Sequence, residues 1–165
     1  MSKLIEGLLE ATLPVPPEVL NQILAGGYVA HAWLGHGNVL FLGFHSNPTP
    51  HKYELANGER PPFQLSTNYA DWHLLDETNH VASIEQEQSE IAEAIKKLAG
   101  MRVDDVNAGL GGTVQIKLSA PAACIRTIVI EPWGSGDGMG QDKYSWAWSV
   151  RTPDGRRFNY PKEKR

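Results

Sequence analysis

The sequence of 165 residues aligns with itself when it is shifted by 74 positions. Eight identities fall in register over 55 positions without a gap, whereas random pairing at ordinary residue usage gives roughly three to four. They are Leu24, Ala25, Gly26, Val29, Gly35, Gly37, Trp72 and Thr78, each matched by the residue 74 positions later. The apolar alternation of residues 40–44 also falls on that of residues 114–118, so the same strand face is predicted to be buried in both copies. The chain is therefore predicted to contain two similar units.

Each unit is predicted to begin with a helix and continue into a β-hairpin. Pro16 and Pro17 favour a helix start and Gly26 its end, which predicts a helix over 18–24. In the second unit, Ser83 and Gln86 form a capping-box pattern ahead of apolar residues spaced by three and four up to Leu98. The predicted hairpins are 28–34 with 39–44 and 102–108 with 113–118, and further strands are predicted at 63–67, 69–75, 124–130, 144–150 and 156–160.

These elements predict an α+β fold in which two helix plus antiparallel β-sheet repeats form one compact unit. The first repeat covers residues 1–80 and includes an N-terminal helix over 4–10, and the second covers residues 81–165 and ends in a basic tail. Trp72, Trp146 and Trp148 alternate with smaller or polar residues and are expected in the core. Trp33 and Trp133 are the tryptophans expected to be exposed, which leaves sugar stacking open as one function.

The formal net charge of −4 is unevenly distributed along the chain. Residues 61–95 contain seven acidic residues and neither Lys nor Arg, whereas residues 151–165 contain six basic residues against two acidic ones. Such an acidic run is typical of a solvated helix face, but it also suits a basic protein partner and argues against a nucleic-acid ligand. The predicted partner-binding residues are Asp71, Asp76, Glu77, Glu87, Glu90, Glu93 and, in the glycine-rich stretch 134–140, Asp137.

The sequence contains no assembled motif for catalysis or for a cofactor. The glycines at 134–140 lack the spacing of dinucleotide or P-loop motifs, and Ser135 lacks the context of a nucleophile elbow. The single cysteine, Cys124, excludes a disulfide framework within the chain and is expected to be buried. All six histidines lie in the first 80 residues without a paired metal-ligand spacing, so no metal site is predicted. They are His31, His36, His45, His51, His73 and His80.

The expected location is the cytoplasm, with no membrane partner. No apolar run approaches the roughly 18 residues that a bilayer span requires. The first ten residues include Glu6 and Glu10 and lack the basic and apolar regions of a secretory signal.

Three segments, Gly37–Phe44, Pro61–Leu74 and Ser145–Gly155, resemble small bacterial immunity-like proteins encoded beside polymorphic toxins. The resemblance covers most of the chain and rests on structural residues, so it carries over no catalytic residue. It implies a protein that binds and neutralises a cognate toxin.

The leading expectation is thus a non-enzymatic cytoplasmic protein that occludes a basic toxin or effector. One alternative is a metal-dependent enzyme or small-molecule binder that uses the histidine-rich first repeat. Another is an assembly module that uses exposed strand edges.

Overall fold

The computed structural model describes residues 17–45, 63–77, 79–108, 112–121, 124–133, 147–151 and 157–160. These residues form two α-helices, one 3-10 turn and ten strands. In chain order they are α2 (Pro17–Leu24), β1 (Tyr28–Leu34), η1 (His36–Asn38), β2 (Leu40–His45), β3 (Phe63–Thr67), β4 (Ala70–Asp76), β5 (Asn79–Ser83), α3 (Gln88–Lys96), β6 (Arg102–Ala108), β7 (Val114–Ala120), β8 (Cys124–Pro132), β9 (Trp148–Arg151) and β10 (Arg157–Tyr160).

All ten strands belong to one sheet with the order β10-β9-β3-β2-β1-β6-β7-β8-β4-β5. Every neighbouring pair is antiparallel. The predicted fold class of two helix plus sheet repeats is therefore wrong: the described residues include only two short helices, and the strands of both halves merge. The physical reason is an exchange of strands, because β4 pairs with β8 of the second half and β9 pairs with β3 of the first.

The sheet has an approximate two-fold arrangement about the contact between β1 and β6. Counted outward from this contact, the strands on one side are β1, β2, β3, β9 and β10, and those on the other side are β6, β7, β8, β4 and β5. Strands at the same place in the two series are counterparts of each other. Around this centre the Gly26 N–H donates to the Val103 carbonyl at 2.8 Å, and the Gly100 N–H donates to the Val29 carbonyl at 2.7 Å. Gly26 and Gly100 have φ of 84° and 87°, in the left-handed region that glycine adopts without steric cost. The shift of 74 residues thus relates β1 to β6 and β2 to β7. In the outer strands the spacing differs, because Trp72 of β4 has the position of Trp148 in β9 and not of Trp146. The domain boundary at residue 80 stays a prediction.

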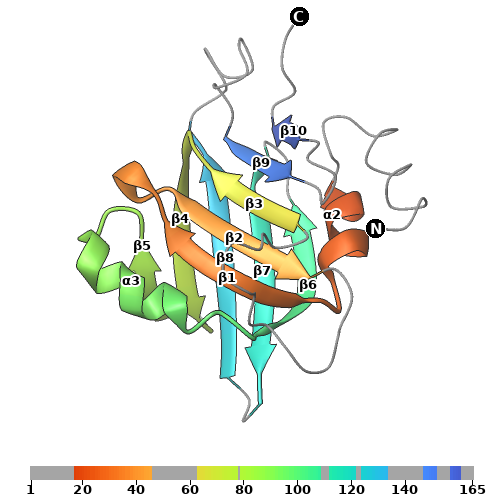
Figure 1. The fold of residues 1–165 in the computed structure, drawn as a ribbon, viewed down its shortest axis with the longest axis horizontal. Coiled ribbons are helices and arrows are strands. Elements are labelled where there is room, and N and C mark those ends of the chain that lie inside the picture. The colour runs from red at the N-terminus through yellow and green to blue at the C-terminus, as the bar shows by residue number, and fades with distance from the viewer. Residues whose placement is uncertain are drawn as a thin grey trace, which may run out of the picture.

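The core lies between the two halves of the folded sheet. In Figure 1, β1, β2 and β3 cross in front of β7 and β8, and α2 and α3 lie at opposite sides. The helix α2 packs against β6, whereas α3 packs against β1 and β5. Each helix contributes buried apolar side chains, as Leu20 and Leu24 do from α2 and Ile91 and Ile95 from α3. Each helix therefore covers a central strand that belongs to the other repeat.

Two buried tryptophans tie β4 and β9 to the hairpins of the sheet. The Trp72 indole N–H donates to the Asn38 carbonyl at 2.8 Å, and the Trp148 indole N–H donates to the Gly112 carbonyl at 2.9 Å. Asn38 and Gly112 are 74 positions apart and both have positive φ. The expected burial of Trp72 and Trp148 is confirmed, and the same hydrogen bond recurs in both halves.

The predicted elements agree with the structure apart from residues 79–87 and the strand predicted over 144–150. Of that strand, 148–150 belong to β9, whereas 144–146, including the expected core residue Trp146, lie outside the described residues. Residues 79–83 form β5, and the helix predicted to start at Ser83 begins only at Gln88, with Glu87 as its N-cap. One bond of the predicted capping box nevertheless forms, because the Ser83 N–H donates to Oε1 of Gln86 at 2.8 Å. The predicted helix over 4–10 lies outside the described residues. None of the helices in the described part of the chain is long and apolar enough to cross a membrane.

Candidate functional site

Two of the predicted partner-binding residues, Glu90 and Glu93, lie on the exposed side of α3, and a third, Glu87, is its N-cap. Glu87, Glu90 and Glu93, which we call the α3 acidic face, are all exposed. Ile91 and Ile95 of the same helix are buried, as the amphipathic spacing predicts. Glu93 forms an ion pair with Lys96 at 3.8 Å, and both side chains are more than 70% exposed. Solvent weakens such a pair, so the acidic face keeps most of its negative charge available.

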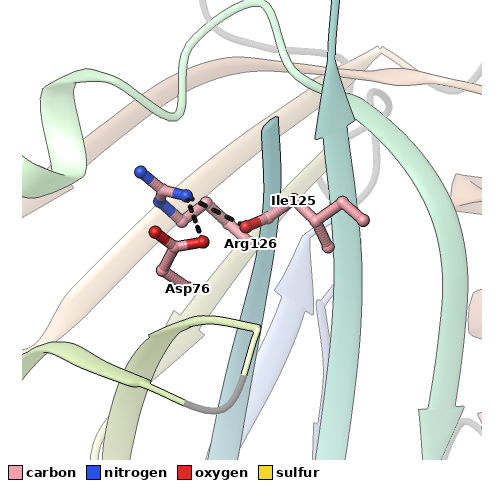
Figure 2. A network of polar contacts seen from close by, with 3 residues as sticks. All are labelled: Asp76, Ile125 and Arg126. Carbon is pink, nitrogen blue, oxygen red and sulfur yellow. Dashed lines mark hydrogen bonds and ion pairs between the residues drawn. The ribbon is translucent and has the colours of Figure 1, made fainter. Parts of the chain in front are cut away.

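The predicted residues Asp76 and Glu77 lie where β4 ends. Figure 2 shows the Arg126 guanidinium between the Asp76 carboxylate and the Ile125 carbonyl. The Nη1 atom of Arg126 lies 3.0 Å from Oδ1 of Asp76 and donates to the Ile125 carbonyl at 3.0 Å. Asp76 is therefore ion-paired with Arg126. Glu77 is exposed and has a φ of 55°.

Asp71 lies near the other end of β4, so the predicted residues do not form one surface. About 16 Å of strand separates Asp71 from Asp76 at the usual rise per residue. The carboxylate Oδ1 of Asp71 accepts a hydrogen bond from the Trp133 indole N–H at 2.7 Å. The last predicted residue, Asp137, lies outside the described residues.

The sequence interpretation missed three neighbours of Asp71 on the outer face of β4 and β8. Asp71 lies opposite Glu131 in the β4–β8 ladder. One position past the Ala70–Pro132 pair, the backbone N–H of Trp133 donates to the Tyr69 carbonyl at 2.9 Å. The rings of Tyr69 and Trp133 meet edge to face with centroids 5.8 Å apart. We call Tyr69, Asp71, Glu131 and Trp133 the aromatic–acid patch.

Both rings of the aromatic–acid patch are unusually accessible for their size. Tyr69 is 42% exposed and Trp133 is 47% exposed, which confirms the expected exposure of Trp133. The only available sequence signal was the alternation along β4, which puts Tyr69 and Asp71 on the face opposite the buried Ala70 and Trp72. The partners from β8 become visible only once the register with β4 is known.

The outward-facing pair next to the patch can be compared with its counterpart on the other side of the sheet, which is covered. Ser66 on β3 faces Ser149 on β9, and both are buried. In the β4–β8 ladder the equivalent pair is His73 and Val129, which are half-buried. Because the two-fold arrangement is broken here, the outer face of β4 and β8 is the more accessible of the two.

The described residues do not bring histidines together as a metal site. The rings of His73 and His80 meet edge to face at 6.3 Å, while His31 packs near Trp33 on the outer face of β1 at 6.4 Å. No group of three or more His, Cys, Asp or Glu residues in this part of the chain is arranged to hold a metal ion. Cys124 is half-buried, so the expectation of a buried thiol is wrong.

No protein-family model matches the chain, and searches of the curated proteins and of the solved structures find no significant match.

Proposed function

We propose that this is a cytoplasmic protein of the immunity type, which binds a basic protein through the α3 acidic face and blocks it. The observation that supports this most directly is the exposure of Glu90 and Glu93 on the solvent side of α3, and of Glu87 at its N-cap, while Ile91 and Ile95 on the other side of the helix are buried in the core. A rigid helix that presents several carboxylates at once suits a partner whose active cleft is basic.

The spacing of these glutamates adds a physical reason for binding a cationic partner. Glu90 and Glu93 are three positions apart in α3, and like charges that close on a helix destabilise it by roughly 0.2–0.5 kcal/mol per pair. Glu87 adds a third carboxylate at the N-cap. Basic side chains of a partner would remove this repulsion. The negative field would also accelerate association, and this acceleration would fall as salt is raised above physiological ionic strength.

The test is a pull-down with tagged protein from a lysate of the source organism, followed by mass spectrometry and a metal assay of the same sample. The first variant is Glu87→Gln/Glu90→Gln, which raises the net charge by two on α3. The matched control is Gln22→Lys/Gln115→Lys, which raises the net charge by the same amount at exposed positions on α2 and β7.

We expect one stoichiometric basic protein to be captured by the wild type and the control and to be lost from the α3 variant. Capture that is equal for both variants would contradict the role of the α3 acidic face. A tightly held metal without any protein partner would favour the histidine-based alternative.

A further inference from the structure

We propose that the aromatic–acid patch is a binding site for the guanidinium group of an arginine side chain on a protein partner. This inference rests on the proposed protein-binding function, but it does not depend on the α3 acidic face. The patch lies near the end of β4 that is remote from Asp76, on the outer face of the sheet. It therefore assigns a second contact region, with its own chemistry.

The four residues of the patch form two adjacent rows on one face of the β4–β8 ladder. Asp71 and Glu131 are directly opposite each other, and Tyr69 and Trp133 form the next outward-facing pair, about 7 Å further along the strands. The hydrogen bond of 2.7 Å from the Trp133 indole to Oδ1 of Asp71 connects the two rows and holds the carboxylate in place. A group that enters this corner meets aromatic rings on one side and carboxylate oxygens on the other.

The carboxylate pair has no cation among the residues that the structure describes. Like charges directly opposite each other in a ladder are destabilising, and neither Asp71 nor Glu131 forms an ion pair with any residue that the structure describes. Oδ2 of Asp71 and both carboxylate oxygens of Glu131 make no hydrogen bond to another described residue. An incoming cation would offset the repulsion and replace solvent water as the hydrogen-bond donor to these oxygens.

Guanidinium suits the patch better than the ammonium group of lysine. It is planar, it stacks on aromatic faces, and its fork of N–H donors spans two carboxylate oxygens at once. The exposed rings of Tyr69 and Trp133 offer such faces beside the oxygens of Asp71 and Glu131. Exposed Trp and Tyr side chains are also the types that most often carry binding energy in protein interfaces.

The experiment is a titration of the full chain, labelled with ¹⁵N, followed by NMR at low salt. The probe is the blocked tripeptide Gly-Arg-Gly, and the matched control peptide is Gly-Lys-Gly. The readout is the indole N–H signal of Trp133, which is assigned by its loss in Trp133→Phe. The indole signals of Trp72 and Trp148, whose N–H groups are bonded inside the protein, report that the fold is intact.

We expect a saturable shift of the Trp133 signal with Gly-Arg-Gly at a Kd of roughly 1 mM, the weak end of specific binding. The lysine peptide should bind at least threefold more weakly. The variant Asp71→Asn/Glu131→Gln should weaken arginine binding about tenfold, because both charges of the site are removed. The control Glu87→Gln/Glu90→Gln should leave it unchanged.

Three results would overturn the inference: no saturable shift, an equal response to both peptides, or an undiminished response in Asp71→Asn/Glu131→Gln with Trp72 and Trp148 signals unchanged. A saturable shift with cellobiose but not with Gly-Arg-Gly would also overturn it and would assign the patch to sugars. Arginine binding without a captured partner in the pull-down would refute the proposed function alone. A captured partner without arginine binding would refute only this inference.

Discussion

The Asn38 side chain connects the turn between β1 and β2 to residues 84–86 by two hydrogen bonds. Substituting it measures how much this connection contributes to the free energy of unfolding. The Nδ2 of Asn38 donates to the Ile84 carbonyl at 3.0 Å and to the Gln86 carbonyl at 2.8 Å. Its φ of 59° lies in the left-handed region. Each partly buried hydrogen bond contributes about 1 kcal/mol to stability, and alanine in a left-handed conformation costs about 1 kcal/mol more than glycine.

We therefore expect Asn38→Ala to lower the free energy of unfolding by about 3 kcal/mol and Asn38→Gly to lower it by about 2 kcal/mol. In urea, with an m-value of about 2 kcal/mol/M, the midpoints fall by about 1.5 M and 1 M. The assay is urea unfolding followed by tryptophan fluorescence, with His36→Ala as a control because His36 is exposed in the same turn. The control should stay within about 0.5 kcal/mol of the wild type.

Either of two results would refute the reasoning about Asn38. A loss below 1 kcal/mol in Asn38→Ala would mean that the two amide hydrogen bonds contribute little. A glycine variant less stable than the alanine variant would mean that the left-handed backbone at this position is not a cost.

Three further predictions concern residues elsewhere in the sheet. Gly112→Ala should lower the free energy of unfolding by at least about 2 kcal/mol in urea titrations, since the φ of 84° is strained for alanine and a Cβ there would clash with the Tyr160 ring. Trp148→Phe should cost about 2 kcal/mol in the same assay, because the indole loses its bond to the Gly112 carbonyl and part of its stacking on Tyr160. A double-mutant cycle of Asp76→Asn and Arg126→Met should give a coupling free energy of about 0.5–1 kcal/mol. Because Asp76 is half exposed to solvent, this coupling should shrink in 1 M NaCl. A coupling that salt leaves unchanged would contradict this prediction.

The local elements were predictable from the sequence because their signals are local. Alternation and glycine turns predicted β1 and β6 with the bounds that the structure shows, and the three-and-four spacing of apolar residues predicted the buried side of α3. The strand β5 was missed because its residues, Asn79–Ser83, are mostly polar or small and precede a strong helix signal. The merged sheet was missed because pairing between β4 and β8 depends on contacts more than 50 residues apart, which periodicity does not encode.

The two candidate surfaces differ in the same way: local spacing predicts one of them, and the other depends on contacts between residues distant in the sequence. The exposure of Glu90 and Glu93 was predictable, since helical spacing places them opposite the buried Ile91 and Ile95. Glu87 is exposed as well, but as the N-cap of a helix that begins later than predicted. The aromatic–acid patch was not predictable, because Asp71 and Trp133 are 62 positions apart and meet only through the register of β4 and β8. Charge counting named both Asp71 and Asp76 and gave them equal weight, although Asp76 is paired with Arg126.

The exchange of strands makes each half of the sheet depend on the other, and this predicts a single cooperative unfolding transition. Among the described strands, the hairpin β4–β5 is joined to the rest of the sheet by β8, and β9 is joined to it by β3. The helices repeat this exchange, because α2 covers β6 and α3 covers β1. If one half unfolded alone, the other would lose two strands or a helix and expose apolar core residues such as Trp72 or Phe44. That exposure costs roughly 25 cal/mol per Å² of apolar surface, which a domain of this size cannot sustain.

Urea unfolding followed by far-UV circular dichroism and by tryptophan fluorescence should therefore give coincident curves. Two separated transitions would show that the halves are stable independently, and the strand exchange would then not govern the stability of the protein.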